Sequence, residues 1–166
     1  MHITSSAVRD GRLDDRFGCR GSDMHLGEMP ARSFPFEICD APQGTASFSV
    51  IFDDYDAVPV CGFTWIHWLV AGLKRASLAE DESRTSRDLI QGVNSWHSCA
   101  APLSKEDASA YGGPCPPDKP HEYSLEVFAL DADTRLRNGF MLNDLMREVD
   151  GHAIARCKLR MAYYPR

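Results

Sequence analysis

Acids, imidazoles and a phenol stand at three separate points of the chain, each beside a stretch with the apolar pattern of a strand. Asp54 and Asp56 follow one such run, and His67 lies within another. His121 and Tyr123 follow a loop rich in proline. Imidazole and phenol groups can donate hydrogen bonds to phosphate oxygens, and charge-assisted hydrogen bonds are the stronger ones. A carboxylate would repel that anion unless it is protonated or holds an imidazole in place, and the second role is expected for at least one of the acids.

The loop before the second imidazole is constrained by its own sequence, YGGPCPPDKPHEY, over residues 111–123. Its four prolines fix φ and bias the preceding residues toward extended backbone, whereas Gly112 and Gly113 permit positive φ or a close approach of another chain segment. We therefore expect a rigid loop that delivers His121 and Tyr123 to the rim of a sheet. Such a rim can hold a small polar ligand.

Several of these residues also have a purely structural interpretation. His67 could be a hydrogen-bonded core histidine, and Asp53 could belong to an Asx-rich turn after a strand. Trp65 shares a strand face with His67, which makes it the better pocket candidate of the two tryptophans beside that histidine. Cys115, between two prolines, is expected to pack within the loop, because no basic neighbour in sequence would lower the pKa of its thiol.

Strand patterns dominate the chain. The third and fourth strand segments alternate apolar and polar residues, and the last places a basic row outward at Arg156, Lys158 and Arg160. The second segment is apolar on both faces, which is typical of a central, covered strand. The four predicted strands cover residues 47–53, 63–70, 123–130 and 155–163.

One helix is predicted over residues 140–149, where apolar residues recur at the i, i+3, i+4, i+7 spacing. Gly151 stands where a glycine would cap that helix. Weaker patterns predict helical turns at residues 83–90 and 105–110.

These elements predict a mainly β protein, a Greek-key antiparallel β-sandwich with a few peripheral helices. Strands separated by long irregular connections favour this architecture over a parallel α/β sheet. The turn-rich first 45 residues are expected to wrap the sandwich as a meandering edge. A length of 166 residues suits one domain that covers residues 1–166.

Charge and hydropathy exclude several classes of partner. The formal net charge of −6 argues against nonspecific binding to nucleic acid or to an anionic membrane, since both require a cationic surface. The first residues lack a basic leader and an apolar core, so no secretory signal is expected. The longest apolar stretch, around residues 63–71, is interrupted by His67 and is too short to span a bilayer, so no integral membrane segment is expected. The expected location is cytoplasmic.

The six cysteines are scattered and include no C-x-x-C pair. This spacing favours reduced thiols over a disulfide framework or a structural zinc site, so no metal and no cofactor are expected. The cysteines are Cys19, Cys39, Cys61, Cys99, Cys115 and Cys157.

The acidic motif at residues 53–57, His67 and the GGPCPP loop before His121 occur in an order that resembles the phosphatidylethanolamine-binding protein family, also called the Raf kinase inhibitor-like family, in its bacterial branch. The resemblance extends over about residues 35–166, and several ordered motifs are more specific than one short motif alone. The other stretches that resemble the family are 42–47, 92–95, 123–131 and 151–152. The chain departs from the family's D-x-D-A-P motif at Val58, where that motif places a proline.

The resemblance implies a β-sandwich with a small pocket at one end that binds phosphate-like anions, including phospholipid head groups. The acidic pair of the family's motif falls on Asp54 and Asp56, its strand histidine on His67 and its H-x-Y pair on His121 and Tyr123. Its pocket loop falls on Gly113 and Pro114. Together with Trp65, which shares the face of the strand histidine, these residues form the candidate ligand-binding site.

Three classes of function remain open on the sequence alone. A small-anion or head-group binding module is favoured, with a possible regulatory role. The first alternative is an inhibitor that binds a kinase or a protease, as the family name implies for some members. The second is a hydrolase that uses a cysteine or serine with His121 and an aspartate, or a zinc ion on His67, His121 and a carboxylate. No local catalytic signature supports an enzyme, so none is expected. The resemblance also makes a homodimer one expected assembly.

Overall fold

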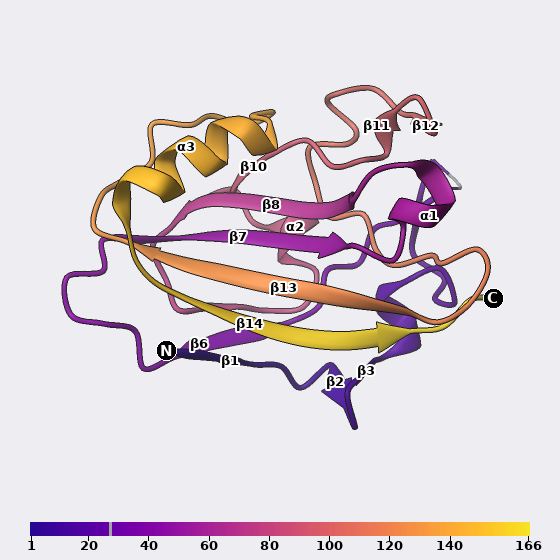
Figure 1. The fold of residues 1–166 in the computed structure, drawn as a ribbon, viewed down its shortest axis with the longest axis horizontal. Coiled ribbons are helices and arrows are strands. Elements are labelled where there is room, and N and C mark those ends of the chain that lie inside the picture. The colour runs from indigo at the N-terminus through magenta and orange to yellow at the C-terminus, as the bar shows by residue number, and fades with distance from the viewer. Residues whose placement is uncertain (27) are drawn as a thin grey trace.

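The structure of the chain, a computed structural model, describes residues 1–26 and 28–166. Its centre is a seven-stranded sheet in the order β10-β8-β7-β13-β14-β3-β2. The four long strands of this sheet are antiparallel neighbours and lie side by side in Figure 1. They are β7 (Ser47–Asp54), β8 (Trp65–Leu73), β13 (His121–Leu130) and β14 (Ala153–Tyr163). All four strands predicted from the sequence are confirmed, with boundaries that differ by a few residues.

Shorter strands complete this sheet and build a second layer. The ends of the large sheet are β10 (Ile90–Gln91) on one side and β3 (Arg12–Leu13) with β2 (Val8–Arg9) on the other. The second sheet has the order β1-β6-β9, and two further strand pairs lie in loops. The strands of the second sheet are β1 (His2–Thr4), β6 (Phe36–Cys39) and β9 (Ser77–Leu78), and the loop pairs are β4 (Met24–His25) with β5 (Met29–Pro30) and β11 (His97–Ser98) with β12 (Ala101–Pro102).

The main core lies between the two sheets. Alternate residues of the long strands point into it, among them Phe52, Trp68 and Leu125, and the second sheet contributes Phe36 and Ile38. The period of two in a strand sends these side chains to one face, so the apolar alternation of the sequence becomes one continuous core. The predicted mainly β sandwich with few helices is confirmed. The prediction for the first 45 residues was incomplete, because β1 and β6 form much of the second layer.

The outer face of the large sheet is covered at one end by the helix α3 (Leu142–His152), which lies over that end in Figure 1. Leu145 and Val149 of α3 pack with Ile51, Phe128 and Leu130 in a second, smaller core. This explains why the third strand loses its polar face near its end. Phe128 and Leu130 stand under the helix, whereas Ser124 and Glu126, nearer the start of β13, lie outside this cluster.

The helices differ from the sequence predictions in detail. The predicted cap at Gly151 is wrong, because α3 continues through His152 and ends against the extended Ala153. The turn predicted at 83–90 contains only the short helix α2 (Glu82–Thr85), and residues 105–110 form turns without a helix. The remaining short helices are η1 (Asp15–Phe17) and α1 (Val58–Cys61). No helix in the described chain is long and apolar enough to cross a membrane.

Candidate functional site

A pocket of about 260 Å³ opens at the end of the sandwich where β7 ends and where β8 and β13 begin. This is the end that carries α1 and the β11–β12 pair, on the right in Figure 1. Antiparallel pairing places Asp54 opposite both Tyr123 and Trp65, so three strands bring their polar ends together. The lining residues are Asp54, Ala57, Val60, Cys61, Trp65, His67, Trp96, Ala100, Ala101, Cys115, Pro116, Pro117, His121 and Tyr123.

His121 is held between two carboxylates. Its Nδ1 lies 2.7 Å from Oδ2 of Asp54, and its Nε2 lies 2.9 Å from Oδ1 of Asp118. Burial alone would lower the pKa of His121, but the hydrogen bonds and charges of the two carboxylates raise it above its ordinary value. Both ring nitrogens can donate only in the imidazolium form. The contact with Asp54 is the orienting contact expected for one of the acids.

Asp54 is itself fixed in position. Its Oδ1 accepts a hydrogen bond from the backbone N–H of Ala57 at 3.2 Å, which closes the turn into α1. Pro59 stands in the first turn of α1, where a missing N–H is tolerated. The one-position shift of proline past Val58 is therefore accommodated at the start of a single-turn helix.

His67 is neutral and is joined to the proline-rich loop by two hydrogen bonds. Its Nδ1 donates to the carbonyl of Gly112 at 2.5 Å, and the N–H of Gly112 donates back to the carbonyl of His67 at 2.8 Å. Burial lowers the pKa of His67 to about 4. Its Nε2 is buried without a partner among the residues described. Because Nδ1 carries the proton, Nε2 presents a lone pair and acts as an acceptor.

Two buried donors complete the polar set. The hydroxyl of Tyr123 and the Nε1–H of Trp96 have no hydrogen-bond partner within the described chain, and both side chains line the pocket. Trp96 is positioned by Asn94, whose Oδ1 accepts from the backbone N–H of Trp96 at 2.9 Å and whose side-chain amide donates to the carbonyl of Ala110. Trp65 packs edge-on against Trp96 with ring centroids 5.7 Å apart.

Three of the predicted site residues stand behind the pocket wall instead of on it. Gly113 donates its N–H to the carbonyl of Pro30, and the carbonyl of Pro114 accepts from the N–H of Cys19. Asp56 accepts from the N–H of Glu122 at 2.9 Å and so fastens the start of β13. None of the three is among the lining residues of the pocket; they support its wall, and a direct contact of these residues with a ligand stays a prediction.

The pocket offers little for nucleophilic or metal chemistry. The neighbouring thiol of Cys19 and burial raise the pKa of Cys115, which opposes a reactive thiolate in the pocket, whereas the same pairing lowers the pKa of Cys19, which is not among the lining residues, to about 7. Both nitrogens of His121 are engaged by carboxylates and not by a hydroxyl or thiol. Across residues 1–26 and 28–166, no group of three or more His, Cys, Asp or Glu side chains is arranged to hold a metal ion.

Comparison with known proteins agrees with this architecture. A family model for phosphatidylethanolamine-binding proteins matches residues 4–164. The chain belongs to the phosphatidylethanolamine-binding protein family. It is 42% identical over 157 residues to an uncharacterised protein, YxkA, of Bacillus subtilis, covering 90% of this chain and 92% of the relative. It is 30% identical over 168 residues to a UPF0098 protein of Chlamydia trachomatis, covering 98% of both.

Solved structures of the same family share the fold. CT736 from Chlamydia trachomatis, described as a phosphatidylethanolamine-binding protein homologue, superimposes with a TM-score of 0.80 at 29% identity, over 99% of this chain and 97% of that one. YbcL of Escherichia coli superimposes with a TM-score of 0.78 at 23% identity, over 99% and 98%. The second comparison supports the fold alone.

The sequence reasoning missed one polar residue that lines the pocket, Trp96, and one that contacts His121 without being among the lining residues, Asp118. Trp96 follows the Gly92–Ser95 motif directly, and that motif was a signal for its position. Asp118 lies three residues before His121 within the constrained loop, so its proximity to that imidazole was also available from the spacing. The apolar wall from α1 and from the β11–β12 turn left no comparable signal.

Proposed function

We propose that this family member is a binding protein whose pocket takes a phosphate-like anion, either a free phosphomonoester or a phospholipid head group. The observation that carries the proposal is His121, whose pKa is raised by the two carboxylates at its ring nitrogens, in a pocket with two unpartnered buried donors, the hydroxyl of Tyr123 and the indole Nε1–H of Trp96. Donors already fixed around a cationic ring lose little freedom when an anion arrives. Three donors from two segments, the start of β13 and the loop that carries Trp96, would surround one phosphate group.

Asp118 stands where that anion would bind. Its carboxylate is half exposed, with 51% of the side chain accessible, and it accepts from Nε2 of the buried His121. An incoming anion can replace this carboxylate at Nε2 while Asp54 keeps Nδ1 engaged. Asp118 therefore serves as a built-in competitor for the ligand.

The neutral His67 adds a requirement on the ligand. Its Nε2 is a buried acceptor without a partner in the described part of the chain, and an unsatisfied buried acceptor is costly. A ligand that carries its own donor, such as the P–OH of a protonated phosphate or the ammonium of ethanolamine, would satisfy it. Sulfate, with acceptors only, should bind more weakly than phosphate.

Substitution of His121 by alanine is expected to weaken phosphate binding by about 1.5 to 3 kcal/mol, the loss for one charge-assisted hydrogen bond. Calorimetric titration with phosphate and with phosphoethanolamine measures the change, and tighter binding of phosphoethanolamine identifies a head-group site. His152→Ala is the matched control, because His152 is exposed and pairs with Asp131 away from the pocket. Equal affinity of wild type and His121→Ala, with both folded by circular dichroism, would remove His121 from the site.

The pH dependence of anion binding should come from His121 and not from His67. Sulfate is the suitable probe, because it carries no titrating proton near neutral pH. Since the pKa of His121 is raised, sulfate affinity should increase as pH falls through a midpoint above about 6.5 and then level off. His121→Gln, which keeps a hydrogen-bonding side chain without the charge, should show no such rise.

Substitution of Asp118 by alanine is expected to strengthen phosphate binding about tenfold, because the competing carboxylate is removed from Nε2 of His121. Loss of the carboxylate also lowers the pKa of His121, so the titration is made at about pH 6, below the ordinary imidazole value. Glu122→Gln removes an equal charge from an exposed neighbour that pairs with Arg160, and it should change affinity much less. Weaker phosphate binding by Asp118→Ala than by wild type would contradict competition.

A further inference from the structure

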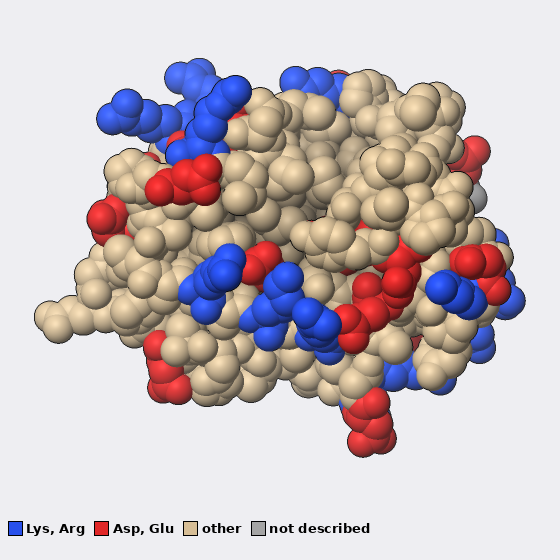
Figure 2. Space-filling model, in the orientation of Figure 1, with Lys and Arg blue, Asp and Glu red and all other residues tan. Residues whose placement is uncertain are grey.

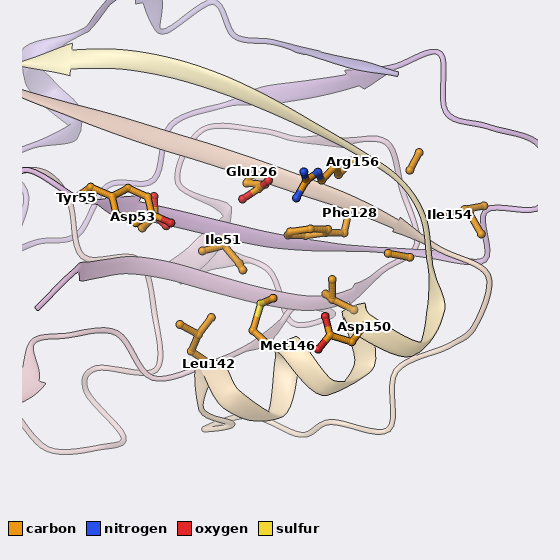
Figure 3. Close-up of a pocket in the computed structure, with 13 residues that line it drawn as sticks. Ile51, Asp53, Tyr55, Glu126, Phe128, Leu142, Met146, Asp150, Ile154 and Arg156 are labelled. Atoms are coloured by element: carbon orange, nitrogen blue, oxygen red, sulfur yellow. The ribbon is translucent and has the colours of Figure 1, made fainter.

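A second cavity lies on the outer face of the large sheet, beside α3 and away from the pocket at the strand ends. Its volume is about 500 Å³, and it forms a groove between the helix and strands β7, β13 and β14. Figure 3 shows Ile51 and Phe128 along its floor, Leu142 and Met146 on the helix side, and Asp53 on the strand side. The whole lining is Ile51, Asp53, Tyr55, Glu126, Phe128, Leu142, Met146, Val149, Asp150, Ala153, Ile154, Ala155 and Arg156.

Asp53 is the unusual residue of this groove. It lies within β7, opposite Ser124 of β13 and Ile66 of β8, and only 7% of its surface is exposed. Its Oδ1 is buried and has no hydrogen-bond partner among the residues described. Buried carboxylates in proteins are almost always paired, because removal of a charge from water is expensive. Asp53 is among the residues that line the groove, so a cation placed there would lie beside its carboxyl group.

The cationic side chains near Asp53 do not pair with its carboxyl group in the described part of the chain. Lys158 of β14 is turned to Glu126, with its Nζ 3.5 Å from Oε2, and it lies above the ring of Tyr55. Arg156 makes no ion pair within the described chain. Figure 2 shows acidic and basic side chains interspersed over the face formed by β13 and β14. Solvent-exposed cations of this kind contribute little to a buried carboxylate.

We propose that this groove is a second binding site, which takes an amphipathic organic cation with its ammonium group at Asp53 and its apolar body along Ile51, Phe128 and Met146. An ammonium would pair with the carboxyl group of Asp53, and an aliphatic or aromatic body would cover the apolar floor. Glu126 and Asp150 add negative charge along the groove. A carboxylate ligand would meet three acids, Asp53, Glu126 and Asp150, against the one cation of the lining, Arg156, and is disfavoured. This inference does not depend on the anion pocket.

The protonation of Asp53 gives the site a characteristic pH dependence. Burial raises the pKa of Asp53 to about 6, with smaller contributions of both signs from the cation of Lys158, from Glu126 and Asp54, and from the hydroxyl of Tyr55. Arg156 and Asp150 face the same groove from β14 and α3. Cation binding needs the ionised carboxylate, so it should strengthen as pH rises through about 6 and then level off.

The test uses hexylammonium as the probe, followed by two-dimensional amide and methionine-methyl NMR on the full chain. Hexylammonium is expected to shift the signals of Phe128 and Met146, and hexanol and hexanoate are expected to bind at least about tenfold more weakly. Asp53→Asn should weaken hexylammonium binding by a similar factor. Glu122→Gln is the charge-matched control, because Glu122 lies on the same strand as Phe128, is exposed and does not line the groove.

A second variant keeps the proposal falsifiable should Asp53→Asn perturb the fold. Met146→Lys places an ammonium on the helix side of the groove, where it can reach toward the carboxylate, and it should abolish hexylammonium binding. Equal binding of hexylammonium and hexanol, an unchanged affinity in Asp53→Asn, or shifts confined to the Trp96 indole in the anion pocket would each overturn the proposal. Binding that does not change with pH between about 5 and 7 would overturn it as well.

Discussion

Substitution of Gly113 by alanine is expected to lower the free energy of unfolding by about 3 kcal/mol, the upper range for overpacking a closed site. A Cβ at this position would lie 2.3 Å from the backbone oxygen of Phe17 and 3.0 Å from Cβ of Pro30. The nearest obstacle is main chain and cannot rotate away as a side chain would. The N–H of Gly113 also donates to the carbonyl of Pro30, so a shift of the loop would strain that bond as well.

Urea denaturation with linear extrapolation measures this loss, and Gly151→Ala is the control. Gly151 lies inside α3 and has no atom within 4 Å of an added Cβ. Alanine there should stabilise the protein by up to about 1 kcal/mol, because glycine is a poor helix former. If Gly113→Ala is as stable as wild type, the loop can move away from η1 at little cost in free energy, and the wall of the pocket is then not rigid.

The long strands could be predicted because their burial follows the period of the backbone. Phe48, Val50 and Phe52 alternate onto the core face, and β8 is apolar on both faces because α3 and the second sheet cover it from opposite sides. Short strands such as β1 and β9 have two or three residues and carry too little periodicity to be recognised. Gly151 shows a second limit of prediction from the sequence: whether a glycine ends a helix depends on where the following strand begins.

The predicted site residues come from strand ends, and antiparallel pairing brings those ends together. Asp54, Trp65 and Tyr123 are adjacent in register, so the polar cluster follows once the strand order is known. Trp96 and Asp118 lie on loops, where side-chain position depends on tertiary contacts such as the clamp between Asn94 and Ala110. The role of a backbone segment is also hard to predict from the sequence. A glycine that lines a pocket and a glycine that supports its wall are the same residue type.

The buried environment of Asp53 could not be predicted for a related reason. Three acids in four residues after an apolar run allow an Asx-rich turn, and this alternative stood beside the predicted strand over residues 47–53. The structure extends β7 through Asp54, so Asp53 belongs to the strand and its side chain is buried on the outer face. The groove above it is formed by α3, which lies about ninety residues further along the chain, and no local pattern reports that contact.

Stability in acid should depend on His67. The free energy of unfolding of wild type is expected to fall by about 3 kcal/mol between pH 6.5 and pH 4 because of His67, and substitution of His67 by asparagine should abolish this decrease. The pKa of His67 is about 4 in the folded chain and about 6.5 when it unfolds, so only the unfolded state takes up the proton in that window. Stability therefore falls as pH falls. Asparagine keeps a donor for the carbonyl of Gly112 and does not titrate.

Asp53 acts in the opposite direction over part of the same range, and this gives the test its internal control. The pKa of Asp53 is about 6 in the folded chain and 3.8 in the unfolded chain, so the folded state binds the extra proton and stability rises as pH falls through that window. Asp53→Asn should therefore lose stability in acid more steeply than wild type, whereas His67→Asn should lose it less steeply. Urea unfolding at four pH values between about 4.5 and 7.5 separates the two slopes. If the free energy of unfolding of His67→Asn falls with pH as steeply as that of wild type, His67 takes up a proton in the folded protein. Its Nε2 would then be a donor to the ligand and not an acceptor.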